Sequence, residues 1–141
     1  MLNPAGSLTI SDCFARYFQN SGVLRTPYPT LPIFSRVSVS ILNSLMNNNG
    51  NGLRVSGTGS QGTALTVRKS LANCNGIGFF VTGATLIFAD TMATGNTQYG
   101  IFVGPIDGDV SHSTLLSYGD NEIDGNATNI SEGTLVAVEK Q

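Results

Sequence analysis

A repeated pattern of short apolar runs that end in Asn and Gly constrains the fold of this chain more than any other feature. The segment VSILNSLMNNNG, from Val39 to Gly50, matches the segment LTVRKSLANCNG, from Leu65 to Gly76, at apolar, Ser, Asn and Gly positions. The segment LIFADTMATGN, which begins at Leu86, follows the same scheme. Self-similarity of this kind indicates a repeat architecture.

Five such units can be aligned along the chain, and a sixth begins near its end. The units are predicted to start at Leu8, Val39, Leu65, Leu86 and Leu116, with a last start at Leu135. A second short apolar run follows each of the five units: GVL, GLRV, GFFV, GIFV and NI. Because the spacing varies while the paired runs persist, we predict constant strands joined by loops of variable length.

Apolar and polar residues alternate within these runs over three to five positions, which is typical of strands. A unit of ~20–30 residues cannot bury its own inward face, so successive units must stack on one another. Equivalent strands of successive units then run in the same direction, about 4.8 Å apart. We therefore predict one all-β domain over residues 1–141, a single-stranded parallel β-helix (solenoid) of about five to six coils.

Composition supports this interpretation and excludes several other classes of protein. Charged residues make up 11% of the chain and hydrophobic residues 40%, a balance that fits neither a disordered chain nor a charged helical bundle. The formal net charge is −2 and the basic residues do not cluster, so we expect no nucleic-acid partner. We also expect no membrane span and no signal peptide in this chain, because it lacks the apolar stretches that both require.

The repeat resembles the right-handed parallel β-helix repeats of the pectin-lyase-like superfamily. In particular it looks like secreted bacterial proteins of unknown function whose last coil carries a phrase close to LLSYGDNEIDGN, and the resemblance covers residues 8–129. The resemblance implies a right-handed solenoid and an extracellular or periplasmic location. It also brings in polysaccharide lyases and glycoside hydrolases as the enzymes of the same superfamily.

The two ends of the predicted solenoid leave two alternatives open. Only the segment MLNPAGS precedes the first coil, which is too short for the cap that normally protects a solenoid core. Either the chain is the C-terminal part of a longer β-helix, or it forms a homo-oligomer through its coil ends. Residues 25–34 are predicted to be a loop insertion, since their prolines cannot donate to a sheet ladder.

Asparagines that recur at the ends of the units are predicted to stack as a ladder at one corner of the coils. Each side-chain amide would donate to the carbonyl of the next, and Asn tolerates the backbone conformation of a tight corner. The predicted ladder consists of Asn49, Asn75, Asn96 and Asn126. We interpret it as structural and not as a set of sugar contacts.

The remaining small polar residues are also interpreted as structural. Ser44, Ser70 and Thr91 recur beside the apolar positions and are expected to form a small inward stack. Cys13 and Cys74 lie two coils apart and in different columns, so their separation exceeds the reach of a disulfide and both are expected to be free thiols.

Aromatic residues on the second strands suggest a ligand face. Phe79 and Phe80 are equivalent to Ile101 and Phe102, so one member of each pair can point outward. A row of outward rings can stack on sugar rings or on another chain. The candidate ligand face comprises Phe79, Phe80, Phe102 and Tyr99.

Residues that carry catalytic or metal chemistry are few. Asp107 and Asp109 form a D-x-D pair in a Gly/Pro loop and are the candidates for Ca²⁺; we expect no other cofactor. His112 is the only histidine. The carboxylates Asp12 and Asp90 do not form the acidic column of a lyase, since Lys69 occupies the equivalent position between them.

We therefore expect a non-catalytic β-solenoid module of a secreted bacterial protein that binds or scaffolds a polysaccharide or a protein partner. No catalytic residue can be named. Two alternatives stay open: a polysaccharide lyase or glycoside hydrolase of the pectin-lyase-like superfamily, and a self-assembling structural subunit.

Overall fold

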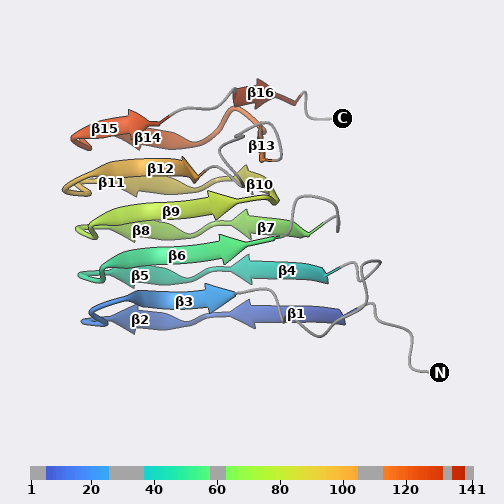
Figure 1. Cartoon of the computed structure of the whole chain (residues 1–141), viewed down its shortest axis with the longest axis horizontal. Coiled ribbons are helices and arrows are strands. Elements are labelled where there is room, and N and C mark those ends of the chain that lie inside the picture. Colours follow the sequence, from blue (N-terminus) through green and yellow to red (C-terminus); the bar gives the residue numbers. More distant parts are fainter. Residues whose placement is uncertain (1–5, 26–36, 58–62, 105–112, 132–134, 139–141) are drawn as a thin grey trace.

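The computed structural model describes residues 6–25, 37–57, 63–104, 113–131 and 135–138, and these residues form an all-β solenoid (Figure 1). Three strands make up each coil, and the chain turns sharply between them. The strands of coils 1 to 3 are β1 (Gly6–Ser11), β2 (Phe14–Arg16), β3 (Ser21–Arg25), β4 (Val37–Leu42), β5 (Leu45–Asn47), β6 (Asn51–Ser56), β7 (Ala64–Arg68), β8 (Leu71–Asn73) and β9 (Ile77–Thr82). The others are β10 (Thr85–Ala89), β11 (Met92–Thr94), β12 (Tyr99–Gly104), β13 (Thr114–Ser117), β14 (Glu122–Asp124), β15 (Thr128–Ile130) and β16 (Leu135–Ala137).

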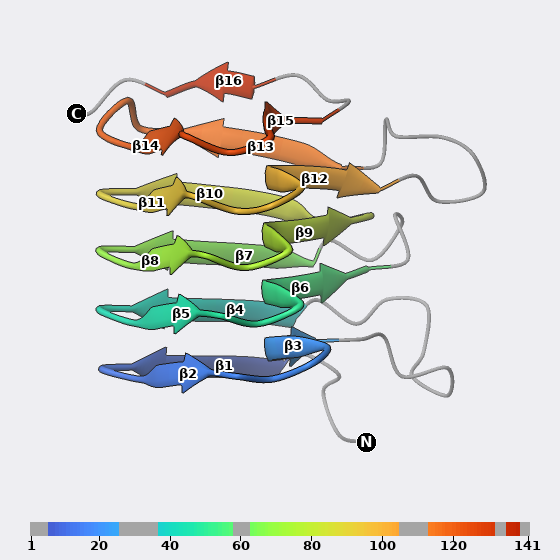
Figure 2. The ribbon, with the colours of Figure 1, turned by 90° about the vertical axis from the view of Figure 1, so that its left-hand side faces the viewer.

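Equivalent strands of successive coils pair in parallel and build three sheets. Sheet A has the order β1-β4-β7-β10-β13-β16, sheet B has β2-β5-β8-β11-β14, and sheet C has β3-β6-β9-β12-β15. The described chain thus makes five complete coils, and β16 opens a sixth (Figure 2). It winds in a right-handed sense from the bottom to the top of both views. The predicted fold class is confirmed.

The register of sheet A confirms the predicted unit starts with one correction. The residues aligned in one column are Leu8, Val39, Leu65, Leu86, Leu115 and Leu135. The fifth unit therefore starts at Leu115 and not at Leu116, which pairs with Ile87 instead. The corner between Ser117 and Glu122 contains one residue more than the equivalent corner between Phe88 and Met92 in the coil below. An alignment that counts back from Asn126 does not include this extra residue, so it places the start of the unit one residue too late.

The core is a stack of inward side chains from all three sheets. Sheet A contributes large aliphatic residues such as Leu65 and Leu86, and sheet C contributes Leu53, Phe79 and Ile101, all at most 1% exposed. The inward positions of the middle coils of sheet B are filled by Met46, Ala72 and Ala93. Each coil covers the apolar interior of the next, as expected for a solenoid.

The turn from sheet A to sheet B uses the same backbone conformation in four successive coils. Asp12, Asn43, Lys69 and Asp90 all have positive φ, between 48° and 54°. In the second, third and fourth coils the residue that follows is a buried hydroxyl: Ser44, Ser70 and Thr91. The Ser70 Oγ atom accepts the Ser44 N–H at 3.1 Å and donates to the Arg68 carbonyl at 2.8 Å. Ser44, Ser70 and Thr91 thus form the inward stack that the sequence predicted.

The turn from sheet B to sheet C carries the asparagine ladder: Asn49, Asn75, Asn96 and Asn126. In each step the Oδ1 atom of one asparagine accepts the backbone N–H of the asparagine in the coil below, at 2.9–3.0 Å. The Nδ2 atom also donates to a backbone carbonyl of that coil, for example from Asn75 to Met46 at 3.0 Å. The predicted amide-to-amide bonds join Asn75 to Asn96 and Asn96 to Asn126.

Glycines next to the asparagine ladder allow the backbones of neighbouring coils to lie close together. A Cβ atom on Gly78 would lie 2.5 Å from the Gly100 carbonyl oxygen and 2.9 Å from the Asn96 Nδ2 atom. In the fifth coil the register places Asn129 at this position. Its Oδ1 atom accepts the Asn126 N–H at 3.4 Å, in the place that the next ladder asparagine takes in the coils below.

Candidate functional site

The outer surface of sheet C carries a cluster of aromatic rings. The Phe80 and Phe102 ring centroids lie 4.9 Å apart, and the Tyr99 ring lies 5.0 Å from that of Phe102. The Arg54 guanidinium carbon stands 4.6 Å above the centre of the Phe80 ring, which is a cation–π contact. These four side chains come from the neighbouring strands β6, β9 and β12, and all are partly exposed. We call them the aromatic face.

Phe79 does not belong to the aromatic face, and its place in the predicted ligand face is wrong. Its side chain is 0% exposed and packs in the core with Leu53 and Ile101, its partners in the register. The physical reason is the alternation of side chains along a strand, which allows only one of two consecutive residues to point outward. Phe80, Phe102 and Tyr99 are brought together as predicted.

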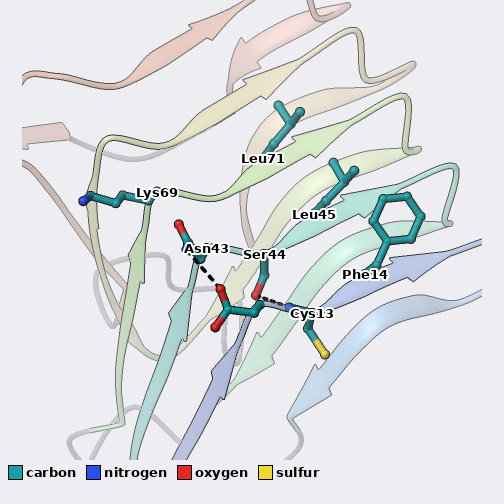
Figure 3. Close-up of a pocket in the computed structure, with 8 residues that line it drawn as sticks. Cys13, Phe14, Asn43, Ser44, Leu45, Lys69 and Leu71 are labelled. Carbon is teal, nitrogen blue, oxygen red and sulfur yellow. Dashed lines mark hydrogen bonds between the residues drawn. The ribbon is translucent and has the colours of Figure 1, made fainter.

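A second surface feature is a depression at the turn from sheet A to sheet B (Figure 3). It has a volume of about 440 Å³ and is lined by residues of three coils: Asp12, Cys13, Phe14, Asn43, Ser44, Leu45, Lys69 and Leu71. A neighbouring depression of about 510 Å³ shares Asp12, Asn43 and Lys69 and adds Arg68. We call the two together the corner groove.

Polar contacts hold the walls of the corner groove. The Asn43 Nδ2 atom donates to the Asp12 Oδ1 atom at 3.0 Å, and the Cys13 N–H donates to the Ser44 Oγ atom at 3.3 Å (Figure 3). Ser44 also donates to the Leu42 carbonyl at 2.7 Å, so its hydroxyl holds the turn. Cys13 and Cys74 are free thiols, as predicted, and both are exposed.

The apolar wall of the corner groove is a column of outward residues on sheet B, Phe14, Leu45 and Leu71, that sequence reasoning missed. The sequence could have predicted this column. Ser44 and Met46 lie on either side of Leu45 and point inward, so the alternation of side chains along a strand directs Leu45 outward. The contribution of Arg54 to the aromatic face was also missed, since nothing in the repeat sets this arginine apart.

The candidate calcium ligands Asp107 and Asp109, and His112, lie outside the described residues. Within the described part of the chain, no three His, Cys, Asp or Glu side chains lie close enough together to hold a metal ion. Of the predicted loop at residues 25–34, only Arg25 is described, and it is the last residue of β3.

No protein family model, curated protein or solved structure matches this chain. The resemblance to the pectin-lyase-like superfamily therefore stays a prediction from the repeat. Nowhere in the described ranges is there a helix with the length and apolar character that a membrane crossing requires.

Proposed function

We propose that this chain is a non-catalytic β-solenoid module that binds a polysaccharide on the aromatic face of sheet C. The observation that supports the proposal most strongly is the contact between the outward rings of Phe80, Phe102 and Tyr99. The core beneath them is filled by other residues, so these rings are not needed to complete it. A location outside the cytoplasm is part of the proposal and rests on the resemblance alone.

The aromatic face offers the two kinds of contact that a sugar chain requires. Aromatic rings present broad apolar surfaces on which the C–H face of a pyranose can stack. The guanidinium of Arg54, which is partly exposed, supplies hydrogen-bond donors for hydroxyl groups. Equivalent positions recur about every 4.8 Å along a parallel sheet, which gives an extended ligand several contact points.

The non-catalytic part of the proposal rests on the composition of the sheet. Glycoside hydrolysis in most known enzymes uses a pair of carboxylates on either side of the scissile bond. The strands of sheet C that the structure describes, from β3 to β15, contain neither Asp nor Glu. We therefore expect a sugar held on this face to be bound and released unchanged.

A glycan array followed by calorimetric titration of the best glycan tests the proposal. Phe80→Ala and Phe102→Ala are each expected to weaken binding at least tenfold. Phe14→Ala is the matched control, because Phe14 is also an outward ring but lies on sheet B and is 53% exposed; it should leave the affinity unchanged.

Three results would overturn the proposal. The first is a chain that binds no glycan on the array. The second is equal loss of affinity in the Phe14→Ala and Phe80→Ala variants, which would place the glycan elsewhere. The third is the appearance of reducing ends or unsaturated uronides in the incubated glycan, which would favour the hydrolase or lyase alternative.

A further inference from the structure

The outer surface of sheet B carries an apolar column that runs along the axis of the solenoid. Four strands contribute one outward residue each, at the same position of the register: Phe14, Leu45, Leu71 and Met92. Figure 3 shows the first three one above another, in the wall of the corner groove. Met92 extends the column to the fourth coil and is 37% exposed. A contiguous apolar strip on the surface of a sheet indicates an interaction site.

Charges of opposite sign stand on this surface at either end of the apolar column. Arg16 of β2 lies on the first coil, and Glu122 and Asp124 of β14 lie on the fifth, all three exposed. The outward positions of the three strands between them are uncharged: Leu45, Asn47, Leu71, Asn73, Met92 and Thr94. Four coil spacings, about 19 Å, separate the cation from the carboxylates, so the charges do not pair within one copy.

The same surface of a second copy, turned end over end, presents the complementary charges. A two-fold axis parallel to the strands of sheet B and level with the third coil keeps the strand direction and reverses the order of the coils. β2 of one copy then lies over β14 of the other, so Arg16 lies opposite Asp124. The Arg16 guanidinium carbon is 4.7 Å from the centre of the Phe14 ring, which lies opposite Glu122. Both carboxylates of β14 therefore meet the cation of the other copy.

The same axis sets apolar residues against one another. β5 of one copy faces β11 of the other, so Leu45 lies opposite Met92, and Leu71 lies opposite Leu71 of the second copy at the axis. Sheets that pack face to face lie about 10 Å apart, which brings such side chains into contact. Burial of these apolar side chains stabilises the pair of copies.

The other two-fold arrangement of the same surfaces is unfavourable. An axis parallel to the solenoid sets each coil against the same coil of the second copy, so Glu122 lies opposite Asp124. Like charges in opposite positions repel one another. Charge complementarity therefore selects the arrangement in which the coils run in reversed order.

We propose that two copies of this chain form a dimer through the outer surfaces of sheet B, with the apolar columns in contact and Arg16 of each copy paired with Glu122 and Asp124 of the other. The contact is isologous, because each copy contributes the same surface, and it closes at two copies. The apolar column provides the affinity and the charges fix the register. The aromatic face lies on sheet C, outside this contact, so the dimer does not depend on the proposed function.

Sedimentation velocity of charge variants, over a range of concentrations, tests the proposal. The unmodified chain should reversibly form a dimer and nothing larger. Arg16→Glu should weaken the dimer at least tenfold, and so should Glu122→Arg combined with Asp124→Arg, because each change sets like charges opposite one another. An equimolar mixture of the two variants should dimerise as the unmodified chain does, because unlike charges then meet at both ends of the contact. All three side chains are exposed, so the variants should keep the fold, which circular dichroism verifies.

Arg68→Glu is the matched control, because Arg68 is also an exposed arginine but lies on sheet A; it should dimerise as the unmodified chain does. A monomeric unmodified chain would leave the apolar column to a different partner and overturn the proposal, and so would a mixture of charge variants that stays monomeric. Persistence of the dimer in both charge variants, or its loss in Arg68→Glu, would place the contact elsewhere. Glycan affinity should be the same in all these variants, so this proposal and the proposed function can fail separately.

Thiol cross-linking locates the axis without any change of charge. Cys74 is exposed and follows β8 of the third coil, so the axis brings Cys74 of the two copies near one another. Cys13 is exposed on the first coil, and the axis separates the two Cys13 residues by four coil spacings, about 19 Å along the solenoid. A short bismaleimide should therefore link two copies of a Cys13→Ser variant and leave a Cys74→Ser variant unlinked. Links through Cys13, or none through Cys74, would contradict the proposed axis.

Discussion

Asparagines of one strand and its following turn illustrate how position decides what a side chain contributes. Asn75 is 1% exposed, and its amide holds the backbone of the coil below through the Asn49 N–H and the Met46 carbonyl. Asn73, two residues earlier, is partly exposed, and its buried Oδ1 atom has no hydrogen-bond partner in the described part of the chain. A buried backbone group that loses its hydrogen-bond partner costs the full free energy of its desolvation. The two asparagines should therefore contribute very differently to the free energy of unfolding.

We expect Asn75→Ala to lower the free energy of unfolding by about 2–4 kcal/mol, because it leaves a buried donor and a buried acceptor unpaired. Asn73→Ala should change it by no more than about 0.5 kcal/mol. Urea denaturation followed by far-ultraviolet circular dichroism measures both. Equal destabilisation by the two substitutions would show that the ladder is not what holds this corner.

At the scale of strands and turns, the turn from sheet A to sheet B repeats one backbone conformation with different residues. Asp and Asn suit positive φ because their short side chains can form hydrogen bonds with nearby backbone groups. Lys69 adopts φ 48° without this advantage. The third of these turns is therefore the one with the least suitable residue.

Lys69→Asn is expected to raise the free energy of unfolding by about 0.5–1 kcal/mol, since Asn adopts the left-handed conformation more readily than Lys. Lys69→Val should lower it by about 1–2 kcal/mol, because a branched Cβ crowds the backbone in that conformation. The midpoints of urea unfolding give the comparison. If the two variants were equally stable, the backbone conformation at Lys69 would not limit stability.

The strands themselves were predictable, and particular side-chain directions were not. Alternation and the recurring Asn and Gly located each strand and each corner. Alternation alone could not decide between Phe79 and Phe80, because both are large and aromatic and either suits a core. The fifth unit was placed one residue too late, at Leu116, because the corner that follows its first strand is longer than the others. The length of a corner depends on local turn geometry, which the spacing of apolar residues does not predict.

At the scale of the whole molecule, the repeat predicted the solenoid because a stack of coils is the arrangement that buries every inward column. The corner groove and the aromatic face were harder to foresee. Each combines residues from three coils, and their mutual distances depend on the register between strands. The stability of the whole solenoid should nevertheless be close to a sum over its coils and the interfaces between them, since each coil contacts only its neighbours.

Deletion of one coil tests this one-dimensional picture directly. Removal of residues 67–87 joins Thr66 to Phe88, which continues the inward column because Phe88 pairs with Val67. The new chain should align Asn49 with Asn96 in the ladder and fold as a shorter solenoid. It should unfold cooperatively with a smaller urea m-value, because less surface is exposed on unfolding, and with lower stability, because one interface between coils is lost.

The matched control removes one residue more. Deletion of residues 67–88 joins Thr66 to Ala89 and shifts every later residue of that coil by one position, which turns its inward side chains outward. Far-ultraviolet circular dichroism and urea titration should show that this chain has no cooperative transition. If both deletions folded equally well, the register of the columns would not determine the stack, and the coils would be held together by apolar collapse alone.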